Sequence, residues 1–161
     1  KLDFHLDSNK TYVMYLNNED VNNEIKKPEI SKYVSIVSAD PLVRKKIVKI
    51  QQNIGKLKGV VMEGRDIGSV VFPKAELKLF ITASLQVRAK RRHQELLTLG
   101  IQSQFKDVLE NLKMRDFADS NRKHSPLICV EDAVVIDNTL MGVNKQFEFV
   151  IQLISKDSYF L

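Results

Sequence analysis

Cysteine and long apolar runs are both scarce in this sequence. The single cysteine, Cys129, cannot form a disulfide within the chain, which favours a reducing compartment and disfavours a secreted, disulfide-stapled fold. No apolar run approaches the roughly 18 residues that a membrane-spanning helix requires, and no basic segment followed by an apolar one opens the chain. These absences predict a soluble, cytoplasmic protein with no membrane partner.

Aromatic residues are also few, at 7%, and tryptophan is absent. The aromatic side chains do not alternate with basic ones, as they do on surfaces that stack single-stranded nucleic acid. The three histidines show no metal-ligand spacing, and no Cys/His set or Ser/His/Asp order indicates a metal site or a hydrolase triad. The net charge of +5 suits an anionic partner, and we expect that partner not to be a nucleic acid.

The remaining composition suits one globular domain with a small subdomain, since 43% of the 161 residues are hydrophobic and 28% are charged. Alternating apolar and polar residues predict strands over 2–6 and 11–16, joined by turn residues at 7–10. A third short strand is expected to run through Ile25 and to close at Pro28. We therefore predict a small antiparallel sheet within residues 1–27.

From Ile30 onward the apolar residues recur at helical spacing. Two successive helices are expected to meet at Asp40 and Pro41, because aspartate caps a helix well and proline suits a first helical turn. Ser84 and Ser103 are expected to open two later helices. In all, strands are predicted over 60–62, 76–82 and 133–137, and helices over 85–99, 103–121 and 143–154. This order predicts an α/β fold with a parallel-sheet core, into which the antiparallel sheet is inserted.

The first candidate site is the 63–68 segment, Glu-Gly-Arg-Asp-Ile-Gly, which places three charges between two apolar runs. Charges at the mouth of a buried strand lose hydration unless a partner or a ligand replaces the water. Ligands of open α/β sheets bind beyond the carboxyl ends of the strands, and the predicted strand 60–62 ends where these charges begin. The segment is therefore expected to face a ligand; the alternative is a strand-end turn with a local salt bridge.

The second candidate is the Arg115–Asp119–Arg122 stripe, in the helix predicted to end near Asn121. Spacings of four and three residues place its three side chains on one helix face. The pattern by itself also fits solvated salt bridges within one helix. Because guanidinium groups match phosphate oxygens and a carboxylate accepts hydrogen bonds from ribose hydroxyls, the stripe also offers what a nucleotide requires.

A third basic cluster includes Arg88 and Arg92, one turn apart in the predicted helix 85–99. A solvated helix surface and a role in neutralising phosphates both explain it. Gly59 and Gly64 have the spacing of P-loop glycines, but Arg65 and Asp66 stand where lysine and serine or threonine are required. No other segment carries this pattern, so the sequence has no recognisable site for the β- and γ-phosphates of a nucleoside triphosphate.

Three segments, in this order and at this spacing, resemble motifs of the bacterial cytidylate kinase family. They are Glu-Gly-Arg-Asp-Ile-Gly-Ser-Val-Val-Phe-Pro at 63–73, Arg-Ala-Lys-Arg-Arg at 88–92 and Arg-Asp-x-x-Asp-x-Asn-Arg at 115–122. A Ser-x-Val-x-x-x-Pro-x-Val-Arg segment at 35–44 and the N-terminal insertion extend the resemblance over nearly the whole chain. The resemblance implies transfer of the γ-phosphoryl group of ATP to CMP or dCMP with Mg²⁺, on a P-loop kinase fold with a short mobile lid.

The resemblance also implies where the cytosine base is recognised. The contacts are expected at Ser35, Arg44 and Asp66. A carboxylate beside the base is chemically sensible, because it accepts a hydrogen bond from the exocyclic amine that cytosine has and uracil lacks.

The same resemblance implies which residues meet the phosphates and the ribose. Arg65 and Arg122 are expected to hold the acceptor phosphate, and Arg115 and Asp119 the ribose hydroxyls, so that the three arginines are the candidate catalytic residues. Arg88 and Arg92 resemble lid arginines that close over ATP. The implied organisation is a CMP-binding region over 1–58 and a core domain over 59–161, with the lid around 84–122.

The sequence departs from the family pattern in two respects. The first strand and P-loop of the family are not found in it, and Glu63 stands where the family usually has an aspartate. We therefore expect a truncated cytidylate kinase that is monomeric, binds CMP or dCMP and ATP, and is inactive alone. The alternatives are a non-catalytic CMP-binding module and, more remotely, a basic nucleic-acid-binding protein.

Overall fold

The computed structural model describes residues 1–8, 10–26 and 28–156, without the side chains of residues 26, 28, 29, 31, 32 and 35. The chain divides into two compact units, Lys1–Lys46 and Ile47–Leu161. The first unit contains an antiparallel sheet with helices, and the second a parallel sheet with helices. The predicted α/β class with a small antiparallel sheet is therefore confirmed.

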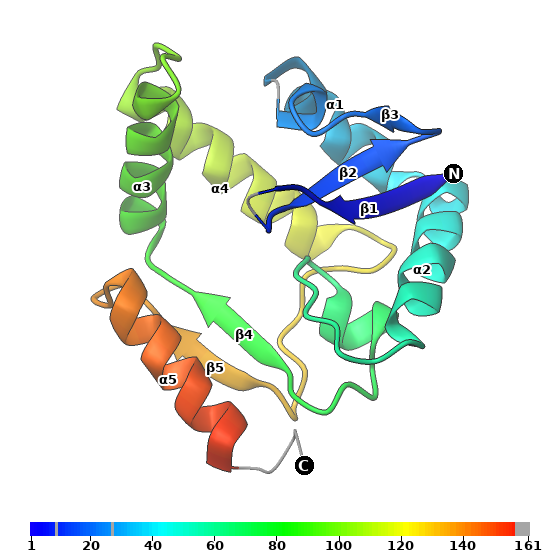
Figure 1. Ribbon diagram of the computed structural model, residues 1–161. Coiled ribbons are helices and arrows are strands. Elements are labelled where there is room, and N and C mark those ends of the chain that lie inside the picture. The colour runs from blue at the N-terminus through cyan, green and yellow to red at the C-terminus, as the bar shows by residue number, and fades with distance from the viewer. Residues whose placement is uncertain (9, 27, 157–161) are drawn as a thin grey trace. The chain divides into compact units, whose positions relative to one another are not determined.

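The sheet of the first unit has the strand order β1-β2-β3 (Figure 1). β1 (Leu2–Leu6) pairs antiparallel with β2 (Tyr12–Leu16), and Phe4 lies opposite Met14. This hairpin lies where the alternation predicted it, because residues with period-two apolar character place one row of side chains on each face of a strand.

The third strand lies earlier than predicted. β3 is the two-residue strand Glu19–Asp20, paired with the end of β2. It begins there because Asn17 and Asn18 both adopt left-handed backbone angles, with φ of 52° and 71°, and so form a two-residue hairpin turn. The residues before Pro28 instead form a short 3₁₀ turn, η1 (Glu24–Lys26).

Two helices follow, α1 (Pro28–Ala39) and α2 (Pro41–Gly55). The predicted cap between them is confirmed: the Asp40 carboxylate accepts hydrogen bonds from the backbone N–H groups of Leu42 and Val43, at 2.8 and 3.0 Å. Those groups belong to the first turn of α2 and have no carbonyl partner within the helix. The boundary between the two units falls within α2.

The core of the second unit is the parallel pair β4 (Leu79–Thr82) and β5 (Val134–Asp137). The register joins Leu79 to Val134 and Thr82 to Asp137, so both strands end at the same edge of the sheet. Ile136 and Val71 are each only 2% exposed and form part of the core. β4 is shorter than the predicted strand 76–82 because the four residues of β5 can pair with only four residues of β4.

The predicted strand over 60–62 is wrong. The structure has no strand there, and the Val61 side chain is 99% exposed. An apolar run forms a strand only when a neighbouring strand satisfies its backbone N–H and C=O groups, and in the described part of the second unit the sheet consists of β4 and β5 alone. The chain next enters the π-helical turn η2 (Ile67–Val71), so the 63–68 segment does not lie at a strand end.

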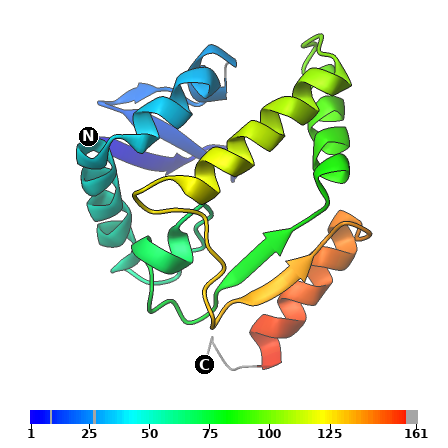
Figure 2. The same ribbon diagram turned by 180° about the vertical axis from the view of Figure 1, so that it is seen from behind.

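Three helices complete the second unit: α3 (Leu85–Thr98), α4 (Phe105–Asn121) and α5 (Val143–Lys156). Ser84 caps α3 as predicted, with its hydroxyl 3.4 Å from the Val87 N–H. Ser103 does not cap α4: the N-cap residue is Gln104, and the Ser103 hydroxyl lies 3.1 Å from Nδ1 of His93. α3 and α4 pack side by side, and α5 lies on one face of the β4–β5 sheet (Figures 1 and 2).

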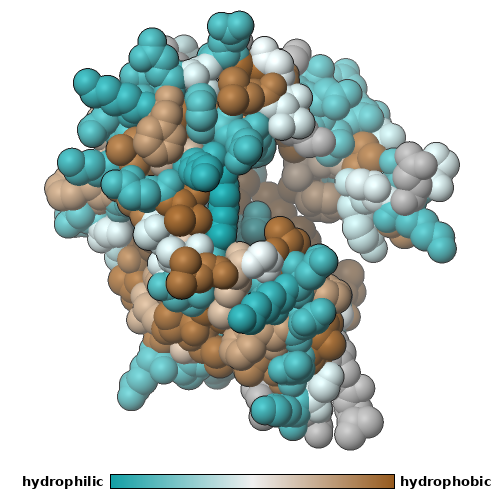
Figure 3. All heavy atoms as spheres, turned by 90° about the vertical axis from the view of Figure 1, so that its left-hand side faces the viewer, coloured by the Kyte–Doolittle hydropathy of each residue, from teal (hydrophilic) through white to brown (hydrophobic). Residues whose placement is uncertain are grey.

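Apolar side chains remain exposed on α5, where Val143 and Phe147 are 85% and 64% exposed. Figure 3 views this side of the second unit and shows apolar side chains gathered over the lower part, where α5 and the sheet lie. Within the ranges that the structure describes, none of the helices combines the length and apolar character needed to cross a bilayer.

Gly55, at the end of α2, allows close packing that a larger residue would prevent. A Cβ atom at this position would overlap the Phe72 ring, so we expect Gly55→Ala to lower the free energy of unfolding by about 2 kcal/mol. Urea denaturation measures the change. Gly142→Ala is the matched control, because a Cβ there meets nothing within 4 Å. Equal stabilities of the two variants would contradict the packing argument.

Candidate functional site

The 63–68 segment holds one buried charge, on Asp66, and two exposed charges, on Glu63 and Arg65. Among the residues that the structure describes, Asp66 is the one polar or charged residue that is buried, at 5% exposure. Its backbone carbonyl accepts hydrogen bonds from the N–H groups of Val70 and Val71, at 2.9 and 3.2 Å, which starts the turn η2. The adjacent Arg65 side chain is 42% exposed. Helical turns of this wide type occur frequently at functional sites.

Arg65 contacts the second predicted motif directly. Its Nε lies 3.0 Å from an Asp119 carboxylate oxygen, and the other oxygen lies 3.7 Å from Nη1 of Arg122. Arg122 also donates from Nε to the carbonyl of Ser125 at 2.5 Å. The carboxylate of Asp119 therefore joins two arginines, one from the 63–68 segment and one just after α4. Two motifs far apart in the sequence form one ion-pair network.

The stripe itself differs from the predicted helix face. Arg122 follows the last residue of α4 and has extended backbone angles, with φ of −66° and ψ of 142°, so helical spacing does not set its position. The side chain of Arg115 is exposed on α4, and it has no hydrogen bond or ion pair with any side chain that the structure describes. The structure thus joins Asp119 and Arg122 to Arg65 but leaves Arg115 apart.

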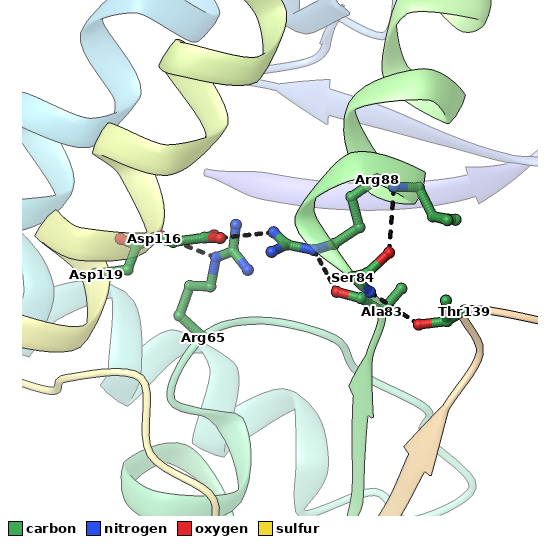
Figure 4. Close-up of polar contacts among 8 residues, drawn as sticks. Arg65, Ala83, Ser84, Arg88, Asp116, Asp119 and Thr139 are labelled. Carbon is green, nitrogen blue, oxygen red and sulfur yellow. Dashed lines mark hydrogen bonds and ion pairs between the residues drawn. The ribbon is translucent and has the colours of Figure 1, made fainter.

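A second ion pair links α3 to α4. Nη1 of Arg88 lies 2.7 Å from the Asp116 carboxylate, and Nε of Arg88 donates to the Ala83 carbonyl at 2.9 Å (Figure 4). Sequence reasoning missed Asp116, although its position three residues before Asp119 on one helix was a usable signal. Arg92, which was grouped with Arg88, instead pairs with Glu95 of its own helix at 2.8 Å.

Arg91, which belongs to the same basic run at 88–92, ties α3 to the loop that follows β5. Its guanidinium donates to the side-chain and backbone oxygens of Asn138, each at 2.8 Å, and to the Met141 carbonyl at 3.3 Å. The Ser84 N–H also donates to the Thr139 hydroxyl oxygen at 2.8 Å. The beginning of α3 is therefore fixed to the edge of the sheet where β4 and β5 end.

Thr139 also lowers the pKa of Asp137, the last residue of β5. The hydroxyl and then the backbone N–H of Thr139 donate to this carboxylate, the N–H at 2.8 Å, and both stabilise its charged form. A carboxyl whose pKa is depressed in the folded state stabilises the protein above the ordinary pKa, near 4, and loses that contribution as the pH falls through the folded value.

We expect Thr139→Val to raise the pKa of Asp137 towards its ordinary value, because the valine keeps the shape but removes the hydroxyl donor. Carboxyl ¹³C chemical shifts followed through an acid titration measure the pKa. Thr98→Val is the matched control, since the Thr98 hydroxyl donates to the Gln94 carbonyl within α3. An unchanged pKa of Asp137 in Thr139→Val would contradict the assignment to the hydroxyl.

Two of the predicted base contacts lie in the first unit. Arg44 is on α2, and its Nη1 donates to the Ser38 carbonyl at 3.2 Å. Ser35 is on α1, and its side chain lies outside the described part of the structure. The roles of Ser35 and Arg44 in contacting the base therefore stay predictions.

Clusters of metal-ligating side chains are a further kind of candidate site. Within the described ranges, no group of three or more His, Cys, Asp or Glu residues is arranged to hold a metal ion.

Comparison with known proteins agrees with the resemblance. A family model described as cytidylate kinase matches residues 1–156. The cytidylate kinase of Flavobacterium psychrophilum is 46% identical over 156 residues, which cover 96% of this chain and 69% of the relative. The cytidylate kinase of Caldanaerobacter subterraneus is 46% identical over 98% of this chain and 69% of the relative. The cytidylate kinase of Parabacteroides distasonis is 50% identical over 86% of this chain and 60% of the relative. The chain belongs to the cytidylate kinase family.

Proposed function

We propose that this chain functions in the transfer of the γ-phosphoryl group of ATP to CMP or dCMP, and that its own residues form the side of the site that binds the acceptor nucleotide. The observation that carries the proposal is the network in which Asp119 joins Arg65 to Arg122. It brings two separate family motifs to one place in the second unit. Two guanidinium groups and a carboxylate are the groups that a phosphate and a ribose require.

Arg65 and Arg122 are proposed to bind the acceptor phosphate, and Asp119 with Arg115 the ribose hydroxyls. In the structure the two arginines are paired with Asp119, so phosphate oxygens would take over guanidinium donors that the carboxylate now holds. Arginine suits this role because its five N–H groups can bind a phosphate with some donors while others still contact Asp119 during the change of partner. Phosphoryl transfer then depends on aligning the acceptor phosphate with the γ-phosphoryl group and on neutralising the charge of the transferring group. It needs little covalent chemistry from the protein.

Asp66 is proposed to recognise cytosine, together with Ser35 and Arg44. A buried carboxylate accepts hydrogen bonds and donates none, so it pairs with the exocyclic amine of cytosine and rejects the carbonyl oxygen of uracil. A site that hydrogen-bonds a polar group of one base also discriminates strongly against a base that lacks that group.

The donor side of the site is proposed to involve Arg88 and Arg92 as lid residues. Family membership implies a P-loop kinase fold and, in general, ATP with a divalent metal. No segment of these 161 residues has the glycine and lysine pattern of a P-loop, so we propose that the chain binds CMP without transferring phosphate by itself. We also propose that it is a monomeric, cytoplasmic protein.

Calorimetric titration tests the binding part of this proposal. The chain is expected to bind CMP and dCMP and to prefer both over UMP and AMP. Equal affinities for all four nucleotides would overturn it. Tight, strongly salt-dependent binding of oligonucleotides that is unaffected by Asp66→Ala would instead favour a nucleic-acid-binding protein.

A coupled assay with ATP, Mg²⁺ and CMP tests the catalytic part. We expect no turnover above background from the 161-residue chain, its mass verified by mass spectrometry. Sustained CDP formation would show that the chain carries a phosphate-donor site that its motifs do not reveal.

A further inference from the structure

Helix α4 carries two carboxylates that each bind an arginine from another part of the second unit. Asp119 binds Arg65 of the 63–68 segment, and Asp116 binds Arg88 of α3. In Figure 4 the two guanidinium groups point toward one another, with the two aspartates beside them. Like charges repel, so this arrangement needs carboxylates nearby to hold it.

Arg88 is held at two points and still has donors for a ligand. Nε donates to the carbonyl of Ala83, a residue only 7% exposed, and Nη1 binds Asp116 at 2.7 Å. These two contacts use two of the five N–H groups of a guanidinium. The side chain of Arg88 is 34% exposed, so the remaining donors are accessible to a ligand.

Buried apolar residues support α3 and α4 in addition to this ion pair. Ala89 of α3 and Val108 of α4 are 0% and 7% exposed, and Ser84 caps α3 independently. The Arg88 and Asp116 side chains are each about one-third exposed, and exposed ion pairs contribute little to stability. The pair therefore has more effect on the direction of the Arg88 guanidinium than on the fold.

We propose that Asp116 is a positioning residue that holds Arg88 next to Arg65, so that the site presents two guanidinium groups to a nucleoside diphosphate. This inference rests on the proposed function, in which Arg65 binds the phosphate of CMP. Arg88, proposed above as a donor-side residue, then binds the second phosphate of CDP, the product, because that phosphate is the group transferred from ATP. CMP has no second phosphate, so its affinity depends little on Asp116. Asp116 acts through Arg88 and does not touch the nucleotide.

Calorimetric titration of the 161-residue chain with CMP and with CDP tests this role. Asp116→Ala removes the acceptor for Arg88 and is expected to weaken CDP binding about tenfold, while CMP affinity changes by less than about twofold. Asp116→Asn keeps a neutral acceptor of the same shape and is expected to retain CDP binding within about threefold of the original. Glu110→Ala, which removes an exposed carboxylate from the same helix, is the matched control and should change neither affinity.

Each outcome is decisive. If CMP binds but Asp116→Ala leaves CDP affinity unchanged or increases it, the positioning role is wrong and the proposed function stands. If Asp116→Asn and Asp116→Ala alter CDP affinity equally, the effect is one of charge and not of orientation, which also overturns the inference. If the unmodified chain binds neither nucleotide, the proposed function fails and this inference fails with it. Thermal unfolding of each variant separates lost binding from lost folding.

Discussion

Asp119→Ala is expected to weaken CMP binding by about thirtyfold, which is the loss expected when a charge-assisted hydrogen bond to the ribose is removed. The variant should also be less stable. The side chains of Asp119 and Arg122 are 18% and 13% exposed, so removing Asp119 takes a carboxylate away from a largely buried guanidinium. The Arg65 side chain is 42% exposed and can be hydrated instead, so the loss of its ion pair with Asp119 costs less free energy than the loss at Arg122.

A nucleotide without ribose hydroxyls isolates the role of Asp119. We expect 2′,3′-dideoxy-CMP to bind the original chain and Asp119→Ala with nearly equal affinity, because it lacks the groups that the carboxylate would accept. Glu110→Ala, on the exposed surface of the same helix, controls for loss of charge from α4. If both nucleotides lose affinity equally in Asp119→Ala, the carboxylate organises the two arginines and does not bind the ribose.

Asp66→Asn is expected to change base preference more than any other single substitution. The carboxylate accepts only, whereas an asparagine amide also donates, so the variant can satisfy the carbonyl oxygen of uracil. We expect the ratio of CMP affinity to UMP affinity to fall by about a hundredfold. Calorimetric titration with both nucleotides measures the ratio.

The fold offers a clear control for Asp66→Asn. Asparagine has nearly the same volume as aspartate, and the Asp66 carbonyl that starts η2 belongs to the backbone and is unchanged. Asp107→Asn makes the same chemical change on the exposed surface of α4. A lower unfolding temperature with an unchanged CMP to UMP ratio would show that Asp66 serves the fold and not the base.

Local elements of the fold were predictable because they depend on residues close together in the sequence. The hairpin of β1 and β2, the Asp40 cap and the Ser84 cap all follow from patterns within a few residues. The strand predicted at 60–62 failed because strand formation depends on a partner elsewhere in the chain. The position of β3 was missed because the left-handed angles of Asn17 and Asn18 were not anticipated.

The candidate site was predictable in its residues but not in its contacts. Arg65, Asp119 and Arg122 were identified from motifs, and they lie in one network. The contacts among these three residues could not be predicted from helical spacing, because that spacing relates only residues of one helix. The same limit explains why Asp116 was overlooked, since its partner Arg88 lies on another helix.

The sequence by itself determined the family, the α/β class and the residue types that suit an acceptor nucleotide, because these follow from motifs and local periodicity. Only the tertiary structure decided which charges meet: Arg65 with Asp119, and Arg88 with Asp116. The physical reason is that an ion pair requires two side chains within about 4 Å, and for residues distant in the chain only the packing of whole elements sets that distance.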